Sequence, residues 1–220
     1  NCLDFTRILQ GLNSSPRVLV IGGAERGSGT ENLWCHKNIE VHSVDVYKTN
    51  EVDVICDGHY LPFESNSYDG VWIQAVLEHV VEPDVVVNEI HRILKEGGVV
   101  YAETPFMQQV HEGAYDFTRY TVLGHRYLFK NFEQICIGGN KGAGTVFAWS
   151  AKYLALSLFR SRSIAKVIGL FCSIFLAPLD KLLSKESMFD ASSGVFFMGR
   201  KRSDFKISHK DLVKLYKGYG

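Results

Sequence analysis

One segment of the chain concentrates acid–base and ring-stacking side chains: His111-Glu-Gly-Ala-Tyr-Asp-Phe-Thr-Arg-Tyr-Thr121. An imidazole or a carboxylate can take a proton from a hydroxyl group, so His111 and Asp116 are candidate general bases. Arg119 could clamp an anionic group, and the rings of Tyr115 and Tyr120 could stack on a cyclic substrate. An ion pair between Asp116 and Arg119 that fixes the loop explains the same spacing equally well.

A second candidate base is His79, which lies in the block Ala75-Val-Leu-Glu-His-Val80. An imidazole titrates near neutral pH and is therefore suited to proton transfer. We favour a structural role for it, in which it caps the following helix or binds a buried carbonyl group.

The glycine-rich turn Gly22-Gly-Ala-Glu-Arg-Gly27-Ser-Gly29 follows a short apolar run. Glycine adopts positive φ and lets a ligand approach the backbone closely, and the next helix points its N-terminus at that ligand. Asp45, with Val46 after it, ends the following run, where a carboxylate can accept hydrogen bonds from ribose hydroxyls. These features suit a nicotinamide cofactor as well as other adenosyl cofactors, and Asp45 could also be an ordinary strand-end residue.

The elements that position these residues alternate between strands and helices. The strands are predicted at Arg17–Ile21, Ile39–Asp45, Val52–Cys56, Tyr68–Ile73 and Val99–Glu103. Helices are predicted at Thr30–His36 and at Pro83–Lys95, whose apolar residues recur at helical spacing before Gly97 and Gly98 stop it. This alternation predicts a parallel sheet covered on both faces.

The second half has a different pattern. A polar and aromatic loop spans 106–119, and the elements expected after it are a helix at 121–129, a strand at 132–137, a glycine-rich turn at 138–144, two apolar helices within 151–183 and a last strand at 194–199. We therefore expect one domain over 1–220, with an apolar helical insertion at 138–190.

Five ordered blocks carry a family resemblance: Asp57-Gly-His-Tyr-Leu-Pro-Phe63, Ser67-Tyr-Asp-Gly-Val71, Ala75–Val80, Glu89–Gly98 and Tyr101-Ala-Glu-Thr-Pro105. In this order and spacing they resemble the type 11 family of class I methyltransferases, which use S-adenosylmethionine (AdoMet). The resemblance runs from Val18 to Pro105. It implies an α/β fold, with a Rossmann-like, seven-stranded, mostly parallel sheet and helices on both faces.

The resemblance also implies the cofactor contacts. Residues of the turn, Gly22, Gly23, Ala24 and Gly27, would face the methionine part of AdoMet. Asp45 would bind the ribose beside Val46, and Asp57 would accept from the adenine amino group next to a backbone contact from Gly58. Gln74 and Ala75 would form the floor beneath the sulfonium. No metal is implied.

Two departures from the family pattern leave an alternative open. The family's acid two residues before the first glycine is replaced by Val20, and the turn is longer than the usual Gly-x-Gly-x-Gly. A non-catalytic module with the same fold, acting as a membrane-associated interaction partner, would tolerate both changes.

The segment from His111 to Thr121 resembles a second signature, H-x-x-P-x-D-F-x-R-Y-T, found in methyltransferases of polysaccharide and glycan assembly. Ala114 replaces its proline. The resemblance implies O-methylation of a sugar or glycan-type acceptor, which could be lipid-linked. His111 and Asp116 are then the expected base, with His79 as the alternative.

The charge distribution bears on partners and location. Residues 1–150 hold 11 Lys and Arg against 19 Asp and Glu, whereas residues 151–220 hold 13 against 5. A net charge of zero gives no overall attraction to nucleic acid, although the basic part suggests an anionic partner. Five scattered cysteines without a Cys-x-x-Cys pair and an N-terminus without an apolar leader segment favour a cytoplasmic protein.

The apolar run Val167–Leu179 is flanked by Arg160, Arg162, Lys166, Lys181 and Lys185. Spanning a bilayer needs about 20 apolar residues, so a run this short is not expected to cross one. We expect residues 151–185 to contact either the inner face of a membrane or a second copy in a homodimer.

Overall fold

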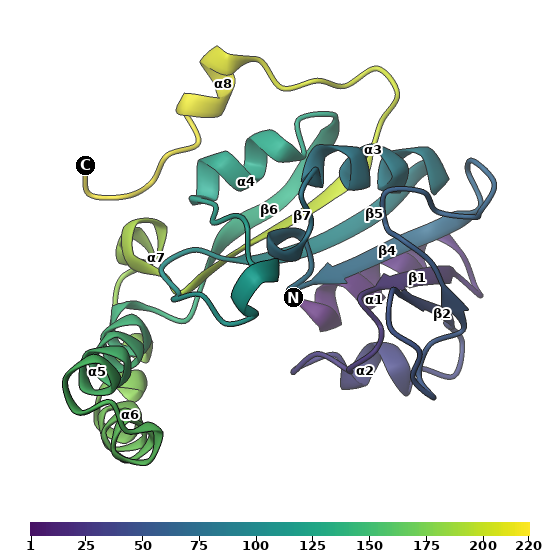
Figure 1. The fold of residues 1–220 in the computed structure, drawn as a ribbon. Helices are drawn as coiled ribbons and strands as arrows, with labels where there is room; N and C mark the ends of the chain where they lie inside the picture. Colours follow the sequence, from purple (N-terminus) through teal and green to yellow (C-terminus); the bar gives the residue numbers. More distant parts are fainter.

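Seven strands form one sheet in the order β3-β2-β1-β4-β5-β7-β6 (Figure 1), in a computed structural model that describes residues 1–220. The strands are β1 (Arg17–Ile21), β2 (Glu40–Asp45), β3 (Val54–Ile55), β4 (Tyr68–Gln74), β5 (Leu94–Pro105), β6 (Phe132–Asn140) and β7 (Gly194–Lys201). The first five run parallel, and β7 is antiparallel to both of its neighbours. The predicted Rossmann-like fold is confirmed.

Helices cover both faces of the sheet, as Figure 1 shows. Helices α3 (Pro83–Ile93) and α4 (Val122–Leu128) lie on one face, and α1 (Cys2–Leu12) and α2 (Glu31–Trp34) on the other. Helix α3 buries Val86, Val87, Ile90 and Ile93 because they recur every three or four residues. Each such side chain stabilises the fold by roughly 1.5–3 kcal/mol. Helix α1, which was not predicted, packs Phe5 and Leu9 against Gly70 of β4.

The strand order reverses between β1 and β4, and this reversal positions the site. Connections leave these two neighbouring strands in opposite directions, which opens a crevice at their carboxyl ends. The glycine-rich turn follows β1 there. Gln74 ends β4 at the same edge, just before the short 3-10 helix η1 (Leu77–His79).

The insertion between β6 and β7 covers residues 141–193. It contains α5 (Ala143–Phe159), α6 (Arg162–Leu176), the 3-10 helix η3 (Ala177–Lys181) and α7 (Lys185–Ala191). The two predicted apolar helices are present, but α5 begins at Ala143, within the expected turn. Strand β6 also runs to Asn140, because Gly138 and Gly139 pair with Phe196 and Val195 of β7. Two further short elements are the 3-10 helix η2 (Gly113–Tyr115) and α8 (His209–Val213).

Candidate functional site

The glycine-rich turn needs its first two glycines. Gly22 has a φ of +82°, and a Cβ placed there would lie 2.2 Å from Cγ2 of Val76. A Cβ on Gly23 would lie 2.7 Å from Cβ of Ser43. The amide groups of both glycines donate to the carbonyl oxygen of Val44 at 2.9 and 3.0 Å, so the chain turns sharply over the end of β2.

Asp45 lies at the carboxyl end of β2 and is half-buried. Its Oδ2 accepts from the amide of Ala24 at 3.0 Å, and its Oδ1 accepts from the amide of Tyr47 at 3.0 Å. Each carboxylate oxygen has a second lone pair. The carboxylate can therefore support the turn and still accept hydrogen bonds from two hydroxyl groups, while Val46 beside it is exposed.

Asp57 follows β3 at the same edge, and 57% of its side chain is exposed. Its Oδ1 accepts from the amide of His59 at 2.9 Å and lies 2.5 Å from Nδ1 of that ring. These hydrogen bonds hold the pKa of the Asp57 carboxyl below its usual range, so it stays an acceptor near neutral pH. A Cβ on Gly58 would meet only ordinary van der Waals contact with Val86.

Gln74 and Ala75 lie under the turn. A Cβ on Gly27 would lie 2.3 Å from Oε1 of Gln74, so a side chain there would displace the end of the Gln74 side chain. The Gln74 amide accepts from Nε1 of Trp72 at 3.3 Å and donates to Oε2 of Glu103 at 3.4 Å. The amide of Ala75 donates to the carbonyl oxygen of Glu103 at 2.9 Å. Glu103 lies near the carboxyl end of β5, beside the crevice. It was not predicted as a site residue.

Val20 is buried and contributes no acid to the crevice. It belongs to the apolar cluster that includes Trp72. A small cavity of about 30 Å³ lies beneath the turn, and Glu25 is the acidic residue that lines it. The turn, the crevice and the two strand-end carboxylates Asp45 and Asp57 together fit an adenosyl cofactor with a charged methionine end.

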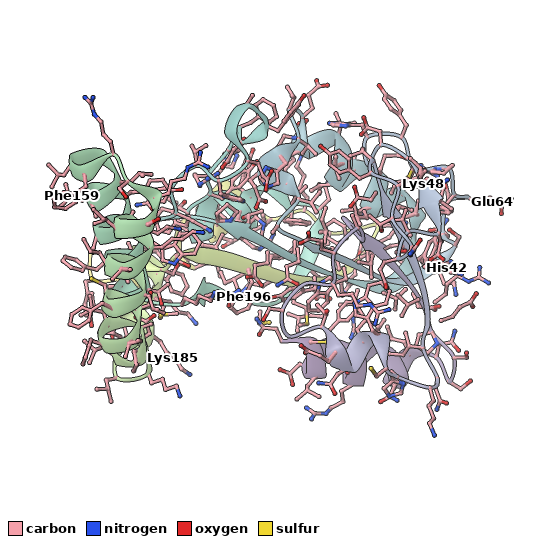
Figure 2. All side chains as sticks on the ribbon, turned by 60° about the horizontal axis from the view of Figure 1, so that its bottom comes forward. His42, Lys48, Glu64, Phe159, Lys185 and Phe196 are labelled. Carbon is pink, nitrogen blue, oxygen red and sulfur yellow. The ribbon has the colours of Figure 1, made fainter.

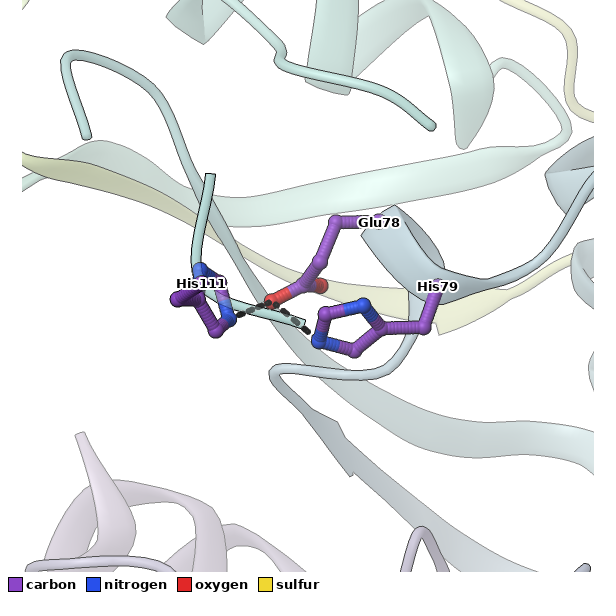
Figure 3. A group of neighbouring side chains, drawn as sticks. All are labelled: Glu78, His79 and His111. Atoms are coloured by element: carbon purple, nitrogen blue, oxygen red, sulfur yellow. Dashed lines mark ion pairs between the residues drawn. The ribbon is translucent and has the colours of Figure 1, made fainter. Parts of the chain in front are cut away.

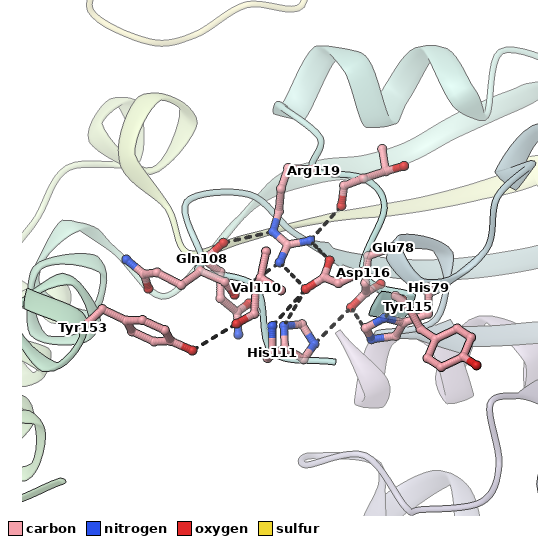
Figure 4. Close-up of polar contacts among 11 residues, drawn as sticks. Glu78, His79, Gln108, Val110, His111, Tyr115, Asp116, Arg119 and Tyr153 are labelled. Atoms are coloured by element: carbon pink, nitrogen blue, oxygen red, sulfur yellow. Dashed lines mark hydrogen bonds and ion pairs between the residues drawn. The ribbon is translucent and has the colours of Figure 1, made fainter. Parts of the chain in front are cut away.

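The loop from Phe106 to Thr121 forms the other side of the site, and Asp116 and Arg119 are paired within it (Figure 4). The Asp116 side chain is fully buried, and the guanidinium of Arg119 binds both of its oxygens. The remaining Arg119 donors bind carbonyl oxygens of Gln108 at 2.9 Å, Gln109 at 3.2 Å and Thr118 at 2.9 Å. All five N–H groups of the guanidinium are thus used, so in this structure Arg119 holds the loop and has no donor left for an anionic ligand.

His111 lies within this loop, and Asp116 holds it in place. The amide of His111 donates to Oδ2 of Asp116 at 3.0 Å, and its ring Nδ1 lies 3.4 Å from the same oxygen. The Arg119 guanidinium holds the pKa of Asp116 far below its usual range. Asp116 is therefore an ionised group that orients His111, and its burial disfavours a role as the base itself.

His79 has its tautomer fixed by the loop. Its Nδ1 lies 2.7 Å from the carbonyl oxygen of Tyr115, and a carbonyl oxygen can only accept. The proton is therefore on Nδ1, and Nε2 of the neutral ring carries a lone pair. The expectation that His79 binds a carbonyl group is consistent with this contact, which leaves its other nitrogen available for proton transfer.

Glu78 connects the two histidines and was missed as a site residue (Figure 3). Its Oε1 lies 3.7 Å from Nε2 of His79 and 4.0 Å from Nε2 of His111, and the two rings are 5.0 Å apart. Its side chain is 1% exposed, Oε2 has no hydrogen-bond partner, and burial raises the pKa of its carboxyl to about 7. The only signal in the sequence was its place beside His79.

The same three residues are the group in this chain that could ligate a metal ion, since one ligand atom from each lies within 4.8 Å of the others. Zinc at its usual bond lengths keeps neighbouring ligand atoms roughly 3.4 Å apart, so a cation would need the cluster to contract.

The two tyrosines differ in access. Tyr115 is exposed at the mouth of the site, whereas Tyr120 is half-buried beside the ring of His125. Tyr115 is therefore the better placed of the two for contact with a substrate ring.

A second hollow lies elsewhere. It has a volume of about 620 Å³ and is lined by residues that include Arg17 and Tyr68, where β1 and β4 begin. It is therefore at the opposite edge of the sheet from the cofactor turn.

Comparison with known proteins agrees with this geometry. Residues 25–102 match the family model described as a methyltransferase domain. A curated relative, the ubiquinone/menaquinone biosynthesis C-methyltransferase UbiE of Saccharophagus degradans, is 33% identical over 76 residues. That stretch covers 34% of this chain and spans 30% of the length of the relative.

Two solved structures share the fold over nearly the whole chain. A candidate sarcosine dimethylglycine methyltransferase from Galdieria sulphuraria is 13% identical, with a TM-score of 0.58 and coverage of 92% of this chain and 84% of its own. Phosphoethanolamine N-methyltransferase 2 from Haemonchus contortus, in complex with phosphomonomethylethanolamine and S-adenosylhomocysteine, is 18% identical, with a TM-score of 0.54 and coverage of 90% and 52%. The chain therefore has the fold of class I methyltransferases, and residues 25–102 in its first half match a methyltransferase domain.

Proposed function

We propose that this protein transfers the methyl group of AdoMet to a hydroxyl group of a sugar or glycan-type acceptor. The observation that carries the proposal is the meeting of two imidazole Nε2 atoms, from His79 and His111, around Glu78 beside the cofactor crevice. A hydroxyl group is a weak nucleophile until a base removes its proton, and a positioned imidazole is a suitable base near neutral pH.

The residues divide the work as follows. AdoMet supplies an activated methyl group when bound, and the turn with Asp45 and Asp57 holds it at the crevice. His111 takes the proton of the acceptor hydroxyl at Nε2. Asp116 is a positioning residue that orients His111 and stabilises the imidazolium formed by that transfer. His79 lies close enough to serve as the second proton acceptor.

The preference for a sugar rests on the loop. The segment from His111 to Thr121 resembles a signature of glycan-assembly methyltransferases, and Tyr115 and Phe117 expose aromatic rings at the mouth of the site. Such rings pack against the apolar face of a sugar. The relatives named above are methyltransferases for carbon and nitrogen acceptors, so they do not supply the oxygen preference.

A non-catalytic module is the competing function. The observation in its favour is Val20, which replaces the acid that the family places near the cofactor. Calorimetric titration with AdoMet separates the two functions, because a module that has lost its cofactor site binds no AdoMet.

Methyl transfer itself is tested with isotopically labelled AdoMet and a panel of nucleotide sugars, lipid-linked sugars, amines and quinones. We expect label in the sugars, and we expect His111→Ala to abolish most of it while AdoMet still binds. Label in the amines or quinones alone would contradict the sugar acceptor. AdoMet binding without transfer to any member of the panel would also count against catalysis of this kind.

A further inference from the structure

The insertion carries an unusually apolar exposed surface. Thirteen large apolar side chains between Phe147 and Leu183 are exposed: Phe147, Leu154, Leu158, Phe159, Ile164, Val167, Leu170, Phe171, Ile174, Phe175, Leu179, Leu182 and Leu183. Figure 2 shows the helices that bear them at one end of the molecule, between Phe159 and Lys185 and far from His42 and Lys48. A soluble monomer rarely exposes an apolar patch of this extent without a binding role.

Helix α6 presents most of these side chains on one stripe. Ile164, Val167, Leu170, Phe171, Ile174 and Phe175 recur every three or four residues, which places them on the same side of the helix. The opposite side packs on α5, where Ala165 and Gly169 are buried. We call the stripe the hairpin face. Val167 is 68% exposed and Leu170 is 64% exposed, so the chain itself covers little of it.

Helix α5 is held between α6 and the loop from Phe106 to Thr121, which we call the acceptor loop. A Cβ on Gly169 would lie 2.9 Å from Cβ of Lys152, which shows how closely the two helices pack. On another side of α5, Tyr153 donates to the carbonyl oxygen of Val110 at 3.0 Å (Figure 4). Gln109 donates to Oγ of Ser150 at 3.2 Å. The hairpin face therefore lies on the outer side of the pair, away from α5.

From the start of α5 to the start of α7, the charged side chains are almost all positive. Six cationic side chains lie between residues 143 and 185: Lys152, Arg160, Arg162, Lys166, Lys181 and Lys185. The one acid in that range is Asp180, whose carboxylate accepts from the amide of Gly144 at 2.8 Å and from Oγ1 of Thr145 at 2.6 Å. Its charge is thus used at the N-terminus of α5, and the other charged side chains of this segment are all cations.

We propose that the hairpin face docks on the surface of an anionic lipid bilayer, with α6 lying in the plane of the interface. A helix with an apolar stripe beside cationic side chains binds such a surface by burying the stripe while Lys and Arg meet the headgroups. A symmetric dimer would set the same face against itself, so like charges from the two copies would be brought together.

Helix length does not by itself distinguish lying on a bilayer from crossing one. The continuous helix Arg162–Lys181 has 20 residues and a mean hydropathy of 1.7, with 11% of it buried, which is long and apolar enough to cross. It exceeds the apolar run that the sequence suggested. Two contacts favour the in-plane arrangement: Asp180 fixes the end of this helix to the start of α5, and Tyr153 and Ser150 fix α5 to the acceptor loop.

Docking has a consequence for the acceptor. Val110 and Gln109, which contact α5, lie next to His111 in the chain, so the docked hairpin holds the mouth of the site near the lipid surface. The acceptor is then a sugar attached to a lipid carrier. This last step rests on the proposed function, whereas docking itself does not.

The test is co-sedimentation of the full chain with vesicles of phosphatidylcholine alone or mixed with phosphatidylglycerol, at low and high salt. We expect the protein to sediment with the anionic vesicles and to be released as salt screens the charges. Arg162→Glu with Lys166→Glu should weaken binding by at least about tenfold, and Leu170→Ser with Phe171→Ser should also weaken it. The matched control is Lys37→Glu with Lys210→Glu, two exposed cations outside the hairpin, which should bind like the unmodified chain.

Three results would overturn docking in the plane of the interface. The first is a protein that stays in the supernatant with both kinds of vesicle. The second is a dimer in solution that Leu170→Ser with Phe171→Ser dissociates, which assigns the face to a second copy. The third is a protein that resists alkaline carbonate extraction from membranes, which indicates a spanning helix. AdoMet titration of the same samples is independent of all three, so a failure of the proposed function is recognised separately.

Discussion

His79 donates from Nδ1 to the carbonyl oxygen of Tyr115 at 2.7 Å, and this hydrogen bond joins the segment after β4 to the loop after β5. It fixes two things together: the tautomer of a candidate base and the backbone position of Tyr115, whose ring is exposed. The loop and the cofactor edge are therefore one unit, in which a change on one side is felt on the other.

The cofactor contact of Asp45 is testable by titration. Asp45→Ala should weaken AdoMet binding by about 1.5–3 kcal/mol, the range for a hydrogen bond to a charged group. Glu40→Ala is the matched control, because Glu40 is an exposed carboxylate at the opposite end of the same strand. Calorimetry should show near-normal affinity for the control. Equal affinities for all three proteins would mean that the ribose is bound elsewhere.

The base is tested by single-turnover methyl transfer. His111→Ala should lower the rate by about 10²–10⁴-fold, the usual loss on removing a general base, with AdoMet affinity unchanged. His79→Ala should have the smaller effect, because it removes the hydrogen bond from Nδ1 to the carbonyl oxygen of Tyr115, which supports the loop, and leaves His111 in place. If His79→Ala instead abolishes transfer and His111→Ala does not, the two residues exchange roles.

The buried pair of Asp116 and Arg119 should show in acid stability. Pairing lowers the pKa of Asp116 in the folded chain, so its stabilising contribution is complete above the unfolded pKa of about 3.9. That contribution is lost as pH falls from there toward the folded pKa. Asp116→Asn should therefore lower the unfolding midpoint in urea at pH 7, with a smaller difference at pH 3. A difference that is the same at both pH values would argue against an ionised Asp116.

Glu78 should have the opposite dependence. Burial raises its folded pKa to about 7, above the unfolded value of about 4.3. The folded state then holds a proton that the unfolded state has released, so stability falls as pH rises between these values. Glu78→Gln should remove a loss of up to roughly 3 kcal/mol between pH 5 and pH 8. The control is Glu112→Gln, an exposed acid in the loop from Phe106 to Thr121, whose pH profile should match that of the unmodified chain.

The parallel part of the fold could be predicted from the sequence because each strand is a short apolar run with a turn after it. Helix α1 was missed although it is as long as α3 and although its buried residues Phe5 and Leu9 stand four residues apart. Gly138 and Gly139 suggested a turn, but in the structure they lie in β6. There a Cβ on Gly138 would come within 3.0 Å of the ring of Phe196, so close packing, not a turn, explains the glycine.

The site was predicted in part. Strand-end residues such as Asp45 and Asp57 follow from the topology, because parallel strands bring their carboxyl ends to one edge. The sequence did not decide whether Arg119 binds an anionic ligand or pairs with Asp116 to fix the loop. Three of its hydrogen-bond acceptors are backbone carbonyl oxygens, which every residue has, so the sequence gives no sign of them. Glu78 was missed because its role depends on its burial, which raises the pKa of its carboxyl. That burial comes from the folded loop above it and cannot be read from the sequence.

The ends of the insertion meet at one point of the sheet. Asn140 and Gly194 are paired across the β6–β7 ladder. The insertion of residues 141–193 therefore leaves the sheet and returns to it at neighbouring positions. A two-residue hairpin turn could connect Asn140 to Gly194 directly and leave the order of the strands unchanged. The insertion is consequently a separable part of the fold: residues 141–193 could be shortened or exchanged while the strands that position the site keep their order.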